Sequence, residues 1–123
     1  MSDKNICCSD EVKTLIVACS GGSNVGQISN SIMVEMDKAG MGSAFCLAGL
    51  GAGLSGFVES AKSAKVVLID GCPVSCGKKI LEAHGIEPSR RFVVTDLGIE
   101  KKHAFEKLGE ETKAALDQVM SNA

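Results

Sequence analysis

The sequence predicts a single α/β domain in which helices cover both faces of a four-stranded parallel sheet. Three observations lead to this prediction. Apolar, strand-like runs alternate four times with helix-like segments, which is the pattern of a parallel sheet. The chain has 123 residues, the length of one domain with a single core. Aromatic residues make up only 3% of it, so we expect a core of Val, Ile, Leu, Met and Ala.

The first half of the chain is expected to contribute two strands and two helices. Residues 1–11 are polar and are predicted to form a flexible arm, which leaves 12–123 for the domain itself. The domain then begins with a strand over 12–19, a glycine-rich turn over 20–26 and a helix to about Ala39 that Gly40 stops. A weaker strand over 43–50, a second glycine-rich turn over 49–56 and a short helix over 57–63 follow.

The second half repeats this alternation twice. A β-branched run over 64–69 predicts a buried strand, and the segment Asp-Gly-Cys-Pro-Val-Ser-Cys over 70–76 turns it into a helix. Gly85 is expected just beyond the end of that helix, as a C′ residue. A strand over 91–95 and a long amphipathic helix over 99–120 close the chain. With right-handed crossovers, the strand order is predicted to be 2-1-3-4, as in a small flavodoxin-like or Rossmann-like sheet with three layers.

Charge and hydropathy exclude several classes of partner. The formal net charge is −2, which gives no electrostatic attraction to nucleic acid or to an anionic membrane. Two long uncharged runs, 14–34 and 39–58, contain too many polar residues or glycines to be membrane spans. The first residues lack the basic and apolar regions of a signal peptide, so we expect a cytoplasmic protein with no membrane partner. The sequence indicates no particular protein partner.

The expected cytoplasmic location determines how the six cysteines are interpreted. A reducing compartment disfavours stable disulfides, so clustered cysteines indicate metal binding, redox chemistry or simple burial. Cys7 and Cys8 lie in the predicted arm, where an incidental pair is favoured over a resolving or metal-transferring pair.

The other four cysteines are predicted to converge at the carboxyl edge of the sheet. Cys19 ends the first strand, Cys46 lies near the end of the second, and Cys72 and Cys76 follow the third. These strands are neighbours in the order 2-1-3, and loops at the carboxyl ends of parallel strands share one edge. Unpaired backbone N–H groups and the helix dipole favour thiolate near Cys72 and Cys76.

Four converging thiolates suit zinc, which is the favoured interpretation, and an iron–sulfur cluster is an alternative. A second alternative is a thiol enzyme in which Cys72 or Cys76 attacks a sulfur, selenium or disulfide substrate and Cys19 resolves. The structural alternative is that these are small buried core residues. The residues expected around the ligands are Asp70, Ser20 and Lys78, the last as a compensating charge.

The loop after Cys19 is a candidate anion-binding loop. Its members are Gly21, Gly22, Ser23 and Asn24, whose backbone N–H groups precede a helix. Its spacing resembles a phosphate loop, but Gln27 stands where the essential Lys belongs. A Gly-x-Gly-x-x-Gly pattern over 51–56 follows the second strand instead of the first, so it is weak support for a dinucleotide site.

Two segments together resemble one family. Ala-Cys-Ser-Gly-Gly-Ser-Asn-Val-Gly-Gln-Ile-Ser-Asn over 18–30 and Asp-Gly-Cys-Pro-Val-Ser-Cys over 70–76 are similar to the DGC-domain family, named after the triplet found here at 70–72. The resemblance spans nearly the whole chain after the arm. It implies a prokaryotic zinc-binding protein, with the ligand role transferred to Cys19, Cys46, Cys72 and Cys76. It does not imply a catalytic residue, and whether the protein is an enzyme stays open.

Overall fold

Four parallel strands run in the order β2-β1-β3-β4 in a computed structural model that describes residues 12–122. The strands are β1 (Thr14–Ala18), β2 (Ser43–Ala44), β3 (Lys65–Asp70) and β4 (Arg90–Val93). The helices are α1 (Asn24–Lys38), α2 (Leu47–Gly51), α3 (Ser55–Lys62), α4 (Cys76–Ala83) and α5 (Leu108–Asn122), and a 3-10 helix η2 (Val94–Leu97) follows β4.

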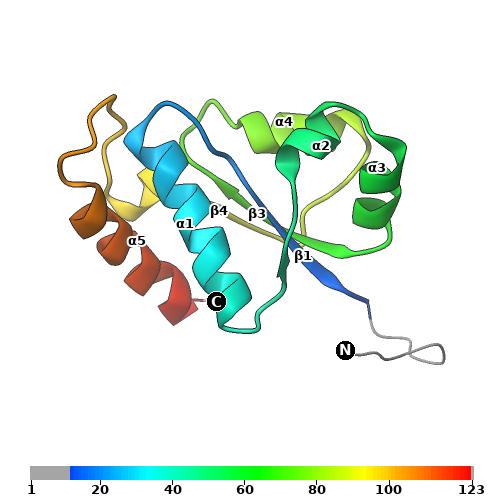
Figure 1. Ribbon diagram of the computed structural model, residues 1–123, viewed down its shortest axis with the longest axis horizontal. Coiled ribbons are helices and arrows are strands. Elements are labelled where there is room, and N and C mark those ends of the chain that lie inside the picture. The colour runs from blue at the N-terminus through cyan, green and yellow to red at the C-terminus, as the bar shows by residue number, and fades with distance from the viewer. Residues whose placement is uncertain (1–11, 123) are drawn as a thin grey trace.

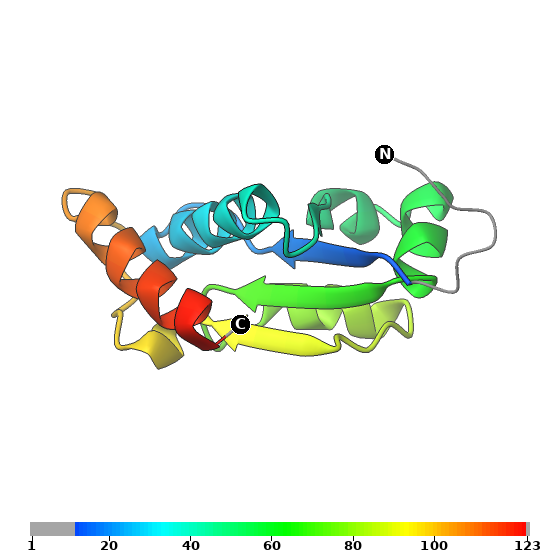
Figure 2. The ribbon, with the colours of Figure 1, turned by 90° about the horizontal axis from the view of Figure 1, so that it is seen from below.

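The central pair of strands carries the longest register. Leu15 of β1 lies beside Val66 of β3, and the pairing continues to Ala18 beside Ile69. The arrows of β1, β3 and β4 point the same way in Figure 2. The predicted all-parallel sheet and its 2-1-3-4 order are therefore confirmed.

Helices cover both faces of the sheet, which confirms the predicted three layers. On one face α1 and α5 lie side by side, and their apolar residues pack with Ile16 and Ile69 (Figure 1). On the other face α2, α3 and α4 pack on Val17, Val66 and Leu68. The core is aliphatic, as the low aromatic content predicted.

Two of the predicted helix ends are confirmed by glycines with positive φ. α1 ends at Lys38, and Gly40 has φ +78°, which allows the N–H of Met41 to reach the carbonyl of Met36. α4 ends at Ala83, and Gly85 has φ +68°. Each glycine adopts the left-handed conformation that closes a helix at low cost.

The second strand is shorter than predicted. It ends at Ala44, and the N–H of Phe45 donates once more to the carbonyl of Ile16 before the chain leaves the sheet. Cys46 therefore precedes α2 instead of lying in a strand, and the predicted turn over 49–56 begins as this helix. The segment 43–49 contains no β-branched side chain, so little favours a longer strand.

The closing helix begins at Leu108 and not near residue 99. Gly98 has φ +83°, and the chain then runs as a loop toward the start of α1 before α5 begins. There the N–H of Asn24 donates to the carbonyl of Lys102 over 3.0 Å. This bond and those of the Asn24 side chain to Glu100 and Lys102 replace the helical hydrogen bonds that the amphipathic pattern predicted.

The outer edge of β2 is occupied by a side chain of α1. The carboxylate oxygen Oδ2 of Asp37 accepts a hydrogen bond from the backbone N–H of Ala44, over 2.7 Å.

None of the helices within 12–122 combines the length and the apolar character that crossing a bilayer requires. The predicted arm over 1–11, with Cys7 and Cys8, lies outside the described residues.

Candidate functional site

The turn after β3 is organised by Asp70, the last residue of the strand. Its side chain is fully buried, and Oδ1 accepts a hydrogen bond of 2.9 Å from the N–H of Gly77 in the first turn of α4. Oδ2 accepts from Nε of Arg91 on β4, over 3.1 Å. Arg91 also donates to Oγ of Ser75, over 2.7 Å. The Asp70 carboxylate therefore connects the end of β3 to the first turn of α4 and to Arg91 on β4.

Close packing brings this turn against the start of α1. A Cβ on Gly71 would lie 3.1 Å from the carbonyl carbon and oxygen of Val25, so this position favours glycine. Ser75 has φ +61°, a conformation that costs a non-glycine residue energy, and its N–H donates to the carbonyl of Cys72 over 3.1 Å. Cys76 then begins α4.

Cys19 follows β1 directly and lies beside the same turn. Its N–H donates to the carbonyl of Ile69 over 2.9 Å, and its carbonyl accepts from Oγ of the buried Ser29. Burial raises the pKa of the Cys19 thiol, and the backbone N–H of Gly71 acts in the opposite direction. Negative charge on Cys76, Asp70 and Cys72 raises the pKa of the Cys19 thiol further.

Two cavities at the carboxyl edge of the sheet contain the four described cysteines. A cavity of about 270 Å³, the cysteine–lysine cavity, is lined by Cys19, Cys72, Cys76 and Lys101. A second, of about 430 Å³, is lined by Cys19, Cys46 and Cys76. Cys19 and Cys76 thus lie between the other two thiols and border both spaces.

The thiols do not form a closed ligand set in this arrangement. Within 12–122, no three Cys, His, Asp or Glu side chains lie close enough together to hold a metal ion. All four described cysteines are free thiols. Cys46 and Cys76 are exposed, whereas Cys19 and Cys72 are half-buried. All four donors are nevertheless thiols, which is the donor chemistry that zinc prefers in structural sites.

Lys101 is the site residue that the sequence did not indicate. Its Nζ lies 3.4 Å from Sγ of Cys72, so the nearest described cation to this thiol comes from the loop before α5. Lys78, predicted as the compensating charge, is exposed on α4 and is not among the described lining residues of either cavity. The sequence did not indicate Lys101 because the helix predicted over 99–120 included it, whereas the structure places it in the loop before α5.

The candidate anion-binding loop is divided between two roles. Gly21, Gly22 and Ser23 line the cysteine–lysine cavity, and Ser20 borders both cavities. Asn24 is instead fully buried, and its amide is used by the loop before α5. Oγ of Ser23 accepts from the N–H of Gly26 over 3.2 Å and so caps α1.

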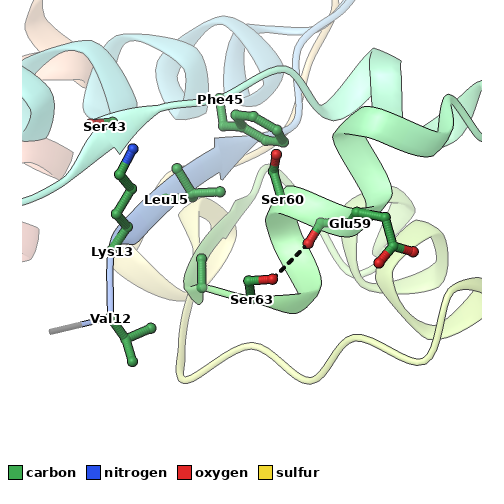
Figure 3. Close-up of a pocket in the computed structure, with 9 residues that line it drawn as sticks. Val12, Lys13, Leu15, Ser43, Phe45, Glu59, Ser60 and Ser63 are labelled. Carbon is green, nitrogen blue, oxygen red and sulfur yellow. Dashed lines mark hydrogen bonds between the residues drawn. The ribbon is translucent and has the colours of Figure 1, made fainter. Parts of the chain in front are cut away.

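A wider cavity of about 710 Å³ lies at the opposite end of β1, away from the cysteines. Figure 3 shows Lys13 and Leu15 on one side of it and the end of α3 on the other, where Oγ of Ser63 donates to the carbonyl of Glu59 over 3.0 Å. Its described lining residues include no thiol or imidazole, so it does not form part of the cysteine site.

Comparison with known proteins identifies the family. The chain matches the DGC domain over residues 15–119. It is 34% identical over 95 residues to "Anaerobic and virulence modulator AnvM" of Pseudomonas aeruginosa, an alignment that covers 76% of this chain and 72% of that protein. No solved structure matches the chain. The resemblance stated from the two cysteine-containing segments is therefore confirmed, and the chain belongs to the DGC-domain family.

Proposed function

We propose that this protein binds zinc through the thiolates of Cys19, Cys46, Cys72 and Cys76. The observation that carries the proposal is that Cys19 and Cys76 border two adjoining cavities, one of which contains Cys72 and the other Cys46. A cysteine side chain turns about a single torsion, so rotation can redirect its sulfur without moving the backbone. The Cys46 side chain makes no capping hydrogen bond to α2, so its rotation breaks no such bond.

Charge at the site supports this assignment. A zinc ion held by four thiolates carries a net charge of about −2, which nearby cations must balance. The Lys101 ammonium is 3.4 Å from Cys72, and the positive end of α1 faces the loop that lines the same cavity. Binding would join the segments after β1, β2 and β3, which suits a structural or sensing role. The similar protein from Pseudomonas aeruginosa is named as a modulator, which favours sensing.

Metal analysis and a visible spectrum of anaerobically purified protein test the proposal. We expect one zinc per chain, no colour and slow alkylation of the four thiols. A brown protein would indicate an iron–sulfur cluster. Metal-free protein whose thiols alkylate rapidly would refute zinc binding. Cys46→Ser tests the ligand that borders only the second cavity: we expect it to lower the zinc content, and unchanged zinc would remove Cys46 from the site.

A thiol-dependent enzyme is the second candidate, because Lys101 contacts one particular thiol. A cation next to sulfur stabilises the thiolate, which is the nucleophile in thiol chemistry. The contact singles out Cys72 among the described cysteines. Cys19 and Cys76 border the same cavity and are placed to act as resolving thiols. Rapid, selective alkylation of Cys72 in metal-free protein would favour this candidate over the zinc site.

A further inference from the structure

We propose that the cysteine–lysine cavity binds a small anion containing sulfane sulfur, and that Cys72 accepts the outer sulfur atom of this anion. The proposal rests on the thiol-enzyme candidate and not on zinc binding. The substrate class is a divalent sulfur atom bonded to an anionic leaving group. Thiosulfate and a low-molecular-mass persulfide both supply this chemistry.

The first support is the position of Lys101. Its Nζ lies 3.4 Å from Sγ of Cys72, and its side chain also lines the cavity that Cys19 and Cys76 border. The ammonium group is therefore next to both the thiol and the space in which a ligand would lie. It can stabilise negative charge on the Cys72 sulfur and on a bound anion.

The second support is that Lys101 is held in place by its neighbours. Nδ2 of the buried Asn24 donates to the carbonyl of Glu100 over 2.9 Å, and Oδ1 accepts from the N–H of Lys102 over 2.7 Å. The residues on both sides of Lys101 are thus bonded to one buried amide. Nδ1 of His103 makes a further contact with the carbonyl of Gly22. These bonds fix the backbone from which the exposed Lys101 side chain extends toward Cys72.

The third support is the chemistry of the cavity wall. Its described lining residues supply three thiols and one ammonium group, together with small and apolar residues and two serines, and they include no carboxylate or imidazole. The described lining of this cavity therefore does not favour reactions that require a carboxylate or an imidazole as the general base. Sulfur exchange requires only a thiolate and a stabilised leaving group. The cavity of about 270 Å³ has room for an ion of this size.

The proposed step balances without an outside oxidant. The thiol proton of Cys72 passes to water, and the thiolate attacks the outer sulfur of thiosulfate. A new S–S bond forms on Cys72 while the S–S bond of thiosulfate breaks. The electron pair of that bond leaves with sulfite, and Cys72 becomes a persulfide. A persulfide donor reacts in the same way and releases a thiolate instead of sulfite.

The test uses the full chain, freed of metal by chelation under argon and incubated with thiosulfate or, separately, with glutathione persulfide. Intact mass and peptide mapping locate the added sulfur, and released sulfite is measured for the thiosulfate arm. We expect one added sulfur on Cys72 in the wild type and none at that position in Cys72→Ser. Reaction with the persulfide alone would support the proposal and identify the donor. No added sulfur with either donor, or equal labelling of Cys46, would overturn it.

Variants of Lys101 test the anion-binding part. We expect Lys101→Gln to slow the thiosulfate reaction about tenfold, because it loses a charge-assisted contact. Lys101→Arg should retain most of the rate, and Lys113→Gln on the exposed face of α5 is the matched control. A neutral aromatic disulfide, with its attachment to Cys72 followed by peptide mapping, reports the reactivity of that thiol without anion binding, so Lys101→Gln should slow this reaction less. Equal slowing of both reagents would contradict anion binding. Zinc content, measured on protein as isolated, tests the zinc proposal independently.

Discussion

The carboxylate of Asp70 and the guanidinium of Arg91 form an ion pair between neighbouring strands, with 3.0 Å from Oδ2 to Nη2. Asp70 is fully buried at the end of β3, whereas Arg91 on β4 is partly exposed. Because Arg91 also bonds Ser75, the pair connects the strand end to the turn that contains Cys72 and Cys76. Asp70, the Asp of the DGC triplet, therefore holds in place the turn that contains Cys72 and Cys76, without lining either cavity.

Replacing this carboxylate should destabilise the fold. Asp70→Asn removes the charge that Arg91 contacts and weakens the acceptor for the N–H of Gly77, so we expect a loss of about 2 kcal/mol in the free energy of unfolding. Urea denaturation measures it. Asp117→Asn on α5 is the control and should change little. A loss no larger than that of the control would show that the ion pair contributes nothing measurable.

Two glycines at helix starts should respond to alanine in opposite ways. A Cβ on Gly77 would lie 2.6 Å from Cδ1 of the buried Leu68 and 2.8 Å from Oδ1 of Asp70. Gly77→Ala should therefore cost about 1–3 kcal/mol through overpacking. Gly56 in α3 has nothing within 4 Å of a Cβ, so Gly56→Ala should stabilise the protein by about 0.5–1 kcal/mol. Thermal melts of the two variants compare them; a change of the same sign in both would refute this packing argument.

The Cys19 thiol of metal-free protein should ionise at higher pH than an unfolded cysteine. Burial raises its pKa, so the folded state favours the neutral thiol. This contribution to stability is present below the ordinary thiol pKa and is lost as the pH rises through the raised value. Alkylation of Cys19, followed against pH by peptide mapping, should show a midpoint above that of urea-unfolded protein. A midpoint below it would mean that the N–H of Gly71 outweighs burial.

Asn24 should control the loop that contains Lys101. Asn24→Ala leaves the carbonyl of Glu100 and the N–H of Lys102 without their side-chain partner, which should cost about 1–3 kcal/mol. Amide exchange of Lys102 should become faster, and that of the central strand β3 should change less. Asn30→Ala on the same helix is the control. Unchanged exchange at Lys102 would show that other contacts hold the loop.

Local patterns were sufficient to predict the architecture. The alternation of strands and helices gave the strand order, because a parallel sheet with short loops allows few others. Gly40 and Gly85 marked helix ends because glycine adopts a positive φ at low cost wherever it stands in the chain. Cys19 and Cys76 could be placed at the sheet edge because each directly adjoins a strand or a helix start.

Contacts between distant segments could not be predicted in the same way. Arg91 is 21 residues from Asp70, and Lys101 is 29 residues from Cys72, so no local pattern connects either pair. The apolar periodicity over 99–120 suggested a single helix, but hydrogen bonds to Asn24 hold residues 100–102 in a loop. Tertiary bonds to a buried amide outweighed helix propensity there.

The hydrogen bond from Ala44 to Asp37 bears on how copies of this protein meet one another. A two-residue edge strand leaves few main-chain groups for another chain to pair with, and the Asp37 carboxylate already occupies the outward donor at Ala44. An approaching strand would have to displace that charge before it could extend the sheet. The Asp37 carboxylate therefore disfavours edge-to-edge pairing of two copies on this side of the sheet.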